Sequence, residues 1–227
     1  MIQIKDLSFS YTKKPPFLLN HINLNIEKGD YISFLGENGS GKSTLVKLIL
    51  KLLEPSEGSI EREAISIGYV PQRFDNLNTQ FPLTVYEMLD CYRKTLRVKD
   101  KKSISEYLDT VKMGKYKKEL IGTLSGGQCQ KIFIARALMG KPDLLILDEP
   151  SNGVDIQSQE EIYTLIKSLN RNDGLTVVSV EHNLKAAISN SSHIYHLSQG
   201  KGHLCKPEEY IREFVENNTG DDSNVTL

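Results

Sequence analysis

The 227-residue sequence lacks long hydrophobic runs, a basic excess and more than a few cysteines. No uncharged apolar stretch approaches the roughly 18 residues of a membrane-spanning helix, so we expect another chain to supply any membrane contact. With 28 Lys and Arg against 29 Asp and Glu, the net charge of −1 does not indicate nucleic acid as a partner. Charge appears by Lys5 with no apolar core, so we expect no signal peptide.

The cysteines, at positions 91, 129 and 205, are odd in number, far apart and form no CxxC pair. This usage favours a reducing compartment over a disulfide framework. His203 and Cys205 could form half of a metal site, but no second pair completes it. We therefore expect an ordinary strand-end or loop pair and no structural metal.

Strand-like and helical stretches alternate along most of the chain. Apolar or alternating runs predict strands at 2–11, 21–26, 31–36, 64–70, 144–148, 176–181 and 193–200. Helical patterns occupy 42–53, 84–96, 103–113, 126–139 and 155–170, with capping boxes at Ser103/Glu106 and Ser125/Gln128. This order predicts an α/β fold with a mainly parallel sheet, an antiparallel β attachment at the N-terminus and a helical subdomain at roughly 75–140. Residues 217–227 are polar, and we expect them to be disordered.

The stretch GENGSGKST, residues 36–44, matches the phosphate-binding pattern GxxxxGK[ST] between a strand and a helix. Its glycines would let the backbone wrap around phosphates at a helix N-terminus. Lys42 would neutralise the β- and γ-phosphates, and Ser43 would place a hydroxyl on Mg²⁺. The sequence therefore predicts a P-loop NTPase.

A second stretch, LLILDEP at 144–150, ends an apolar strand in two carboxylates. In a P-loop protein Asp148 would hold the Mg²⁺ shell, and Glu149 would orient or deprotonate the attacking water. A third stretch, LSGGQ at 124–128, places two glycines at a helix start without the lysine of a phosphate loop. Such a turn suits an anion held by backbone N–H groups, but the sequence alone does not say whose phosphate it would hold.

Together these motifs, with SNGVD at 151–155 and a histidine after a strand, resemble the ATP-binding subunit of an ABC transporter over about residues 2–210. The resemblance implies one ATPase domain over 1–216 and two copies stacked head to tail around two ATP molecules. Ser125, Gly126, Gly127 and Gln128 would then contact the nucleotide held by the other copy. It also implies an integral membrane permease, an extracytoplasmic substrate-binding protein, no nucleic acid, and a place at the cytoplasmic face of the cell membrane.

The same resemblance assigns roles to single residues. Tyr11 matches the aromatic that stacks on adenine, Asp155 the loop that reaches the opposite subunit, and His182 the γ-phosphate contact. Gln72 matches the glutamine that approaches Mg²⁺ and water and senses the permease. The expected nucleotide-binding loop consists of Gly36, Glu37, Asn38, Gly39, Ser40, Gly41, Lys42, Ser43 and Thr44. The expected Mg²⁺ ligands of MgATP are Ser43, Gln72 and Asp148, and the expected catalytic residues are Glu149, His182 and Gln72.

After the signature this family usually has a polar residue, then Gln and Arg, whereas this sequence has Cys129, Gln130 and Lys131. Lys131 keeps a charge but loses the planar fork of arginine. Cys129 could make the turn sensitive to oxidants or simply pack against the helix. Around residues 77–89, LNTQFPLTVYEML resembles zinc and manganese importers at the place where a permease docks. A soluble ABC ATPase of iron–sulfur assembly, translation or repair, or an importer of another solute, remains an alternative; a kinase or GTPase would need no LSGGQ.

Overall fold

The computed structural model describes residues 1–72 and 82–216, with side chains up to Glu213. The chain divides into two compact units. Unit 1 consists of Met1–Glu63 and Val178–Leu227, and unit 2 of Ala64–Val177. Each unit is described by itself below.

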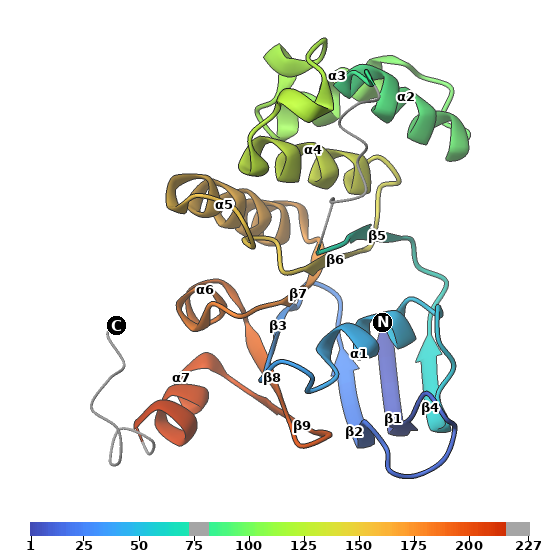
Figure 1. The fold of residues 1–227 in the computed structure, drawn as a ribbon, viewed down its shortest axis with the longest axis vertical. Coiled ribbons are helices and arrows are strands. Elements are labelled where there is room, and N and C mark those ends of the chain that lie inside the picture. Colours follow the sequence, from blue (N-terminus) through green and yellow to red (C-terminus); the bar gives the residue numbers. More distant parts are fainter. Residues whose placement is uncertain (73–81, 217–227) are drawn as a thin grey trace. The chain divides into compact units, whose positions relative to one another are not determined.

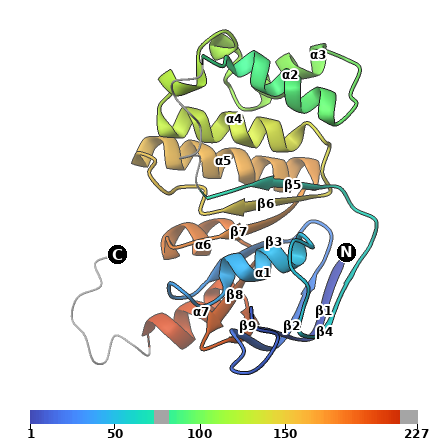
Figure 2. The ribbon, with the colours of Figure 1, turned by 45° about the vertical axis from the view of Figure 1, so that its right-hand side comes forward.

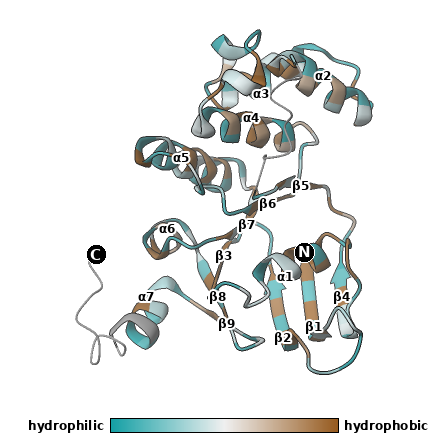
Figure 3. Cartoon of the chain, in the orientation of Figure 1, coloured by the Kyte–Doolittle hydropathy of each residue, from teal (hydrophilic) through white to brown (hydrophobic). Residues whose placement is uncertain are grey.

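A three-stranded antiparallel sheet forms the first half of unit 1, in the order β2-β1-β4. Its strands are β1 (Ile2–Phe9), β2 (Leu19–Ile26) and β4 (Glu57–Arg62). Side chains alternate between buried and exposed along β2, because successive residues of a strand point to opposite faces. Figure 3 shows this as brown and teal bands on β1 and β2.

Parallel pairing appears in the second half of unit 1. Strand β3 (Tyr31–Leu35) is buried at every position and runs parallel to β8 (His193–Ser198), with Leu35 opposite His196. Strand β9 (Lys201–Cys205) pairs antiparallel with β8. Helix α1 (Lys42–Ile49) follows β3, and α6 (Leu184–Asn190) precedes β8. The short helix α7 (Pro207–Tyr210) and a π-helical turn, Ile211–Glu216, complete the described part.

Unit 2 combines buried strands with helices. Strand β5 (Ile67–Val70) runs parallel to β6 (Leu144–Asp148), and β7 (Thr176–Val180) begins in this unit. The helices are α2 (Val85–Thr95), α3 (Lys102–Thr110), α4 (Gly126–Leu138) and α5 (Ile156–Asp173), with 3₁₀ turns at Gly114–Tyr116 and Ile121–Thr123. In Figures 1 and 2, α5 lies between α4 and the β5–β6 pair, and α2 and α3 lie beyond α4.

The predicted fold class is confirmed: parallel strand pairs, an antiparallel N-terminal sheet and a helical middle are all present. Two strands were missed. Strand β4 was hidden in a stretch that reads as a helix stop, and β9 is short and mostly exposed. Helix α1 ends at Ile49, short of the predicted residue 53, and Lys51 takes a left-handed φ of 59°.

The two predicted capping boxes had different outcomes. At Ser125 the prediction is confirmed, since its side chain accepts from the Gln128 N–H and the Gln128 side chain accepts from the Ser125 N–H. At Ser103 it is wrong: α3 begins at Lys102, and the Ser103 hydroxyl donates to the Asp100 carbonyl at 2.7 Å.

Some expectations lie partly or wholly outside the described residues. The start of the helical subdomain near residue 75 and the tail at 217–227 are both in that group. A single domain over 1–216 stays a prediction. None of the helices in the described ranges is both long and apolar enough to cross a membrane.

Candidate active site

The loop between β3 and α1 is held by glycines in conformations that other residues rarely adopt. Gly36, Gly39 and Gly41 have φ angles of 148°, 83° and 99°. Gly41 is the N-cap of α1 and provides no side-chain hydrogen bond to the first turn. The first N–H groups of a helix lack partners within the helix, so an anion can bind there.

Gly36 also has no room for a side chain. A Cβ atom at this position would lie 2.1 Å from the Leu197 carbonyl oxygen and 2.8 Å from the Ser40 hydroxyl oxygen. The loop therefore starts in direct contact with β8, which fixes its position in unit 1.

Lys42 is 6% exposed and folds back over the loop. Its ammonium donates to the Gly36 carbonyl at 2.7 Å and to the Glu37 carbonyl at 2.9 Å. The Ser40 hydroxyl oxygen is buried and has no hydrogen-bond partner among the described residues. A buried hydroxyl without a partner is costly, and a phosphate oxygen would supply one. The loop thus fits a polyphosphate by its backbone, its charge and its unpaired hydroxyl.

Tyr11 lies in the same unit as this loop. Its side chain is 65% exposed, and its ring packs edge-on against Phe9 with the centroids 5.0 Å apart. The hydroxyls of Tyr11 and Thr44 are 3.1 Å apart, which anchors the ring to the first turn of α1. An exposed ring tied to the phosphate loop can stack on a base. That role stays a prediction.

In unit 2, β6 ends in the two predicted carboxylates. Asp148 is 5% exposed, and the Tyr69 hydroxyl donates to its Oδ2 at 3.5 Å. Burial, followed by the negative charge of Asp148, raises the pKa of Tyr69 to about 12. Tyr69 therefore stays protonated at neutral pH and acts as a donor toward Asp148.

Glu149 adopts a left-handed backbone with φ of 53°. For a residue with a Cβ this conformation is strained, and such strain clusters at functional sites. Two side-chain amides donate to the same carboxylate oxygen, Oε2: Nε2 of Gln72, and Nδ2 of Asn152 at 3.0 Å. The structure thus brings the predicted residues Gln72 and Glu149 together.

Sequence reasoning did not single out Asn152, whose side chain contacts the Glu149 carboxylate. The signal available was an asparagine three residues after Glu149 in a turn-forming stretch, EPSNG. In the structure the Asn152 N–H donates to the Glu149 carbonyl at 3.1 Å, which closes this turn.

The signature turn begins α4 with ordinary backbone angles, since neither Gly126 nor Gly127 has a positive φ. Both positions require glycine because neighbouring atoms leave no room for a side chain. A Cβ on Gly126 would lie 2.9 Å from the Gly153 carbonyl oxygen, and one on Gly127 would lie 2.4 Å from the Ser158 Cβ. The turn is therefore packed against the start of α5.

The residues flanking the turn have local partners. Lys131 forms an ion pair with Glu161, which joins α4 to α5. Burial raises the pKa of the Cys129 thiol to about 11, which favours the packing interpretation over an oxidant-sensitive thiolate.

Asp155 caps α5 by accepting from the Ser158 N–H at 2.9 Å, and this bond is the main cause of the lowered pKa of the Asp155 carboxyl. Contact of Asp155 with another subunit stays a prediction.

The remaining predicted histidine, His182, is exposed and lies between β7 and α6 in unit 1. The neighbouring Asn183 caps α6 by accepting from the Ala186 N–H at 3.0 Å.

His203 and Cys205 both lie on strand β9, and His203 Nε2 is 3.5 Å from the Glu213 carboxylate. The predicted groups are thus divided between the units: Tyr11, residues 36–44 and His182 lie in unit 1, and Gln72, Asp148, Glu149, residues 125–128 and Asp155 lie in unit 2.

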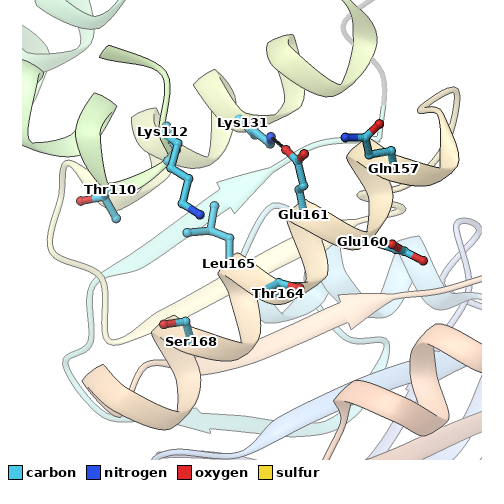
Figure 4. A pocket seen from close by; sticks show the side chains of 10 residues that line it. Thr110, Lys112, Lys131, Gln157, Glu160, Glu161, Thr164, Leu165 and Ser168 are labelled. Atoms are coloured by element: carbon cyan, nitrogen blue, oxygen red, sulfur yellow. Dashed lines mark hydrogen bonds and ion pairs between the residues drawn. The ribbon is translucent and has the colours of Figure 1, made fainter. Parts of the chain in front are cut away.

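Unit 2 also contains a groove of about 540 Å³ between the end of α3, α4 and α5. Figure 4 shows Lys131 of α4 paired with Glu161 of α5 along its wall, with Lys112 and Leu165 beside them. None of the predicted site residues lines this groove.

A glycine loop with a folded-back lysine, together with a buried strand that ends in Asp-Glu, defines the class of P-loop nucleoside triphosphatases. Comparison with known proteins identifies the family. The family model of the ABC transporter matches residues 19–152, which is more than half of the chain. The chain belongs to the ABC transporter family and is an ATPase that binds nucleotide.

The relatives include a Treponema pallidum protein named "Probable metal transport system ATP-binding protein". It is 52% identical over 95% of this chain and 90% of its own length. The zinc uptake system ATP-binding protein ZurA of Listeria innocua is 39% identical over 88% of this chain and 83% of its own length. Among solved structures, the ATP-binding cassette MJ0796, bound to ADP and Pi in a dimeric post-hydrolysis state, is similar with a TM-score of 0.77. It is 30% identical, and the match covers 91% of this chain and 99% of that chain.

Proposed function

We propose that this chain powers the uptake of a divalent transition metal, zinc first and manganese next, by hydrolysing ATP for a separate permease. The observation that carries this proposal is the similarity, over nearly the full chain, to proteins named for metal transport and zinc uptake. The resemblance of residues 77–89 to metal importers agrees with it, although residues 77–81 lie outside the described part.

Nucleotide binding is assigned to unit 1. The backbone of Gly36–Gly41 and the hydroxyl of Ser40 would hold the phosphates, Lys42 would exchange its carbonyl partners for phosphate oxygens, and Tyr11 would stack on adenine. Mg²⁺, when bound with ATP, neutralises the charge that develops on the phosphates. Hydroxyl, amide and carboxylate oxygens suit this hard cation, so Ser43, Gln72 and Asp148 are its proposed ligands.

Hydrolysis is assigned to Glu149 as general base, with Gln72 beside the attacking water and His182 at the γ-phosphate. The strained backbone of Glu149 and the amide donors on its carboxylate support this role, because a base must be held in a fixed orientation.

A second copy of this chain completes the proposed site. Two chains would stack head to tail, with residues 125–128 and Asp155 of one near the nucleotide of the other. The signature turn agrees with this arrangement, because the first lysine after it in the sequence, Lys131, is already paired with Glu161. ATP bound at the interface would stabilise the dimer, and hydrolysis would weaken it.

Mixed dimers test this arrangement. Combining Ser125→Arg chains with Lys42→Ala chains gives one site damaged twice and one intact site if the turn acts in trans. Equilibrium nucleotide binding to isolated heterodimers should then retain one tight site. Heterodimers without an intact site would contradict the head-to-tail arrangement.

The proposed complex includes an integral membrane permease that holds this chain at the cytoplasmic face of the membrane, and an extracytoplasmic binding protein that delivers the metal to it. The Gln72 loop and residues 81–87 would face the permease. Within that segment Thr84 and Glu87 form a capping box that begins α2.

Growth in chelator-treated medium tests the transport assignment. A strain without this chain should recover when zinc, or at higher concentration manganese, is added back as a single metal. If its zinc and manganese requirements equal those of the parent strain and another solute fails to enter, the metal assignment is wrong and the ATPase assignment stands.

A further inference from the structure

In the turn after β6, the side chain of Asn152 donates a hydrogen bond to the Glu149 carboxylate. Its Nδ2 lies 3.0 Å from Oε2. The same oxygen accepts from Nε2 of Gln72, which comes from a different segment of unit 2. Both donors are neutral amides, so they orient the carboxylate without forming an ion pair with it.

The position of Asn152 is set by its own backbone. Its N–H donates to the Glu149 carbonyl at 3.1 Å, so one residue holds Glu149 at both the main chain and the side chain. Glu149 has φ of 53°, a conformation that surrounding contacts must maintain. A main-chain bond and a side-chain bond from the same asparagine are contacts of this kind.

The segment that carries Asn152 is itself anchored. Gly153 and Val154 pack against the signature glycines, since a Cβ on Gly126 would meet the Gly153 carbonyl at 2.9 Å and one on Gly127 would meet the Val154 side chain at 3.2 Å. Gln159 reaches back from α5 and donates to the Ser151 carbonyl at 3.1 Å and to the Val154 carbonyl at 2.7 Å. Asn152 therefore has a fixed support on both sides.

We propose that Asn152 is a positioning residue that orients the Glu149 carboxylate for its attack on the proton of the hydrolytic water. The inference rests on the proposed role of Glu149 as general base. A carboxylate that rotates freely spends less time in the geometry that proton transfer needs, so loss of this donor lowers turnover and spares nucleotide binding.

Two substitutions separate this role from a purely structural one. Asn152→Ala removes the donor, and Asn152→Asp keeps the shape and the turn but places a second carboxylate beside Glu149. We expect kcat to fall roughly ten-fold in Asn152→Ala, because misplacement of a reacting group by about 1 Å costs up to 10²-fold. In Asn152→Asp the fall should be larger. The KM for ATP and the Kd for ADP should stay within about two-fold of the wild-type values.

Asn172→Ala is the matched control. Asn172 is also an exposed asparagine of unit 2 whose amide makes one side-chain bond, to the Ser168 hydroxyl at 3.0 Å. Asn172 lies at the C-terminal end of α5, away from the Glu149 carboxylate. The Asn172→Ala variant should therefore hydrolyse ATP at the wild-type rate.

A double-mutant cycle with Glu149→Gln, followed by single-turnover hydrolysis over hours, gives the decisive comparison. If Asn152 acts through Glu149, then Asn152→Ala costs nothing further in the Glu149→Gln background. Equal losses in both backgrounds, wild-type turnover in Asn152→Asp, or a loss that follows the melting temperature overturns the inference. Wild-type turnover in Glu149→Gln alone would instead refute the base assignment on which the inference rests.

Discussion

Two glycine-rich turns begin helices in this chain, one in each unit, and they need glycine for different physical reasons. Around Gly36–Gly41 the requirement is mainly conformational, because three of the glycines have positive φ angles. At Gly126 and Gly127 the backbone is ordinary and the requirement is space against Gly153 and Ser158. Similar sequence patterns therefore encode a loop shape in one unit and a packing contact in the other.

The charge around the two turns differs in the same way. Lys42 of the first turn donates to the backbone carbonyls of Gly36 and Glu37, and phosphate oxygens can replace these carbonyls. The lysine after the second turn, Lys131, has a carboxylate partner in Glu161. The pairing of Lys131 with Glu161 agrees with the proposal that the second turn contacts a phosphate already neutralised by another chain.

The largest effect is expected for Gly36→Ala. A sparsely populated backbone conformation and an overpacked contact each cost about 1–3 kcal/mol, so the free energy of unfolding should fall by about 2–6 kcal/mol. The comparison variant Gly39→Ala shares the positive φ, but its Cβ would meet nothing within 4 Å. It should lose only about 1–2 kcal/mol.

Urea denaturation without nucleotide measures both variants. Equal losses for the two would mean that the contact of Gly36 with the Leu197 carbonyl yields easily, and that conformation alone explains both glycines.

An intermediate effect is expected for Gly127→Ala, where overpacking against Ser158 costs about 1–3 kcal/mol. Removal of a helical glycine returns up to about 1 kcal/mol, so the net loss should be about 1–2 kcal/mol. Ser158→Gly removes the Ser158 Cβ and Oγ atoms that the new Cβ at position 127 would contact. In that background the Gly127→Ala substitution should be neutral or stabilising. Thermal unfolding of the four proteins of this cycle gives the coupling energy. Additive effects would show that Gly127 is not a packing glycine.

The sequence predicted the local parts of this comparison well. The capping box at Ser125 depends on neighbours three residues apart, and it is present. The same pattern at Ser103 was wrong because α3 begins one residue earlier and Asp100 supplies the bonds of its first turn. A short pattern identifies a helix start only when no competing polar residue lies just before it.

What could not be predicted depends on contacts between distant segments. The bond from Gln72 to Glu149 joins residues 77 apart in the chain, and the packing of Gly127 on Ser158 joins two helices. Strand β9 escaped prediction because it is exposed at most positions and depends on pairing with β8. Motif spacing predicted Glu149 as a reacting group, but only the tertiary structure shows that the Gln72 and Asn152 amides donate to its carboxylate.

The smallest effect is expected at Cys129, which follows the signature turn. Burial raises the pKa of this thiol to about 11, so at pH 8 only about one molecule in a thousand carries the reactive thiolate. Iodoacetamide should modify Cys129 far more slowly than the exposed Cys91, as peptide mass spectrometry can follow, and Cys129→Ser should hydrolyse ATP within about two-fold of the wild-type rate. Since the folded pKa lies above the ordinary value of 9.0, the thiol's contribution to stability is present below pH 9 and is lost as the pH rises through 11. Rapid modification of Cys129 at pH 8, or loss of ATPase activity under mild oxidation that Cys129→Ser prevents, would show that the second turn is a reactive site as well as a packing contact.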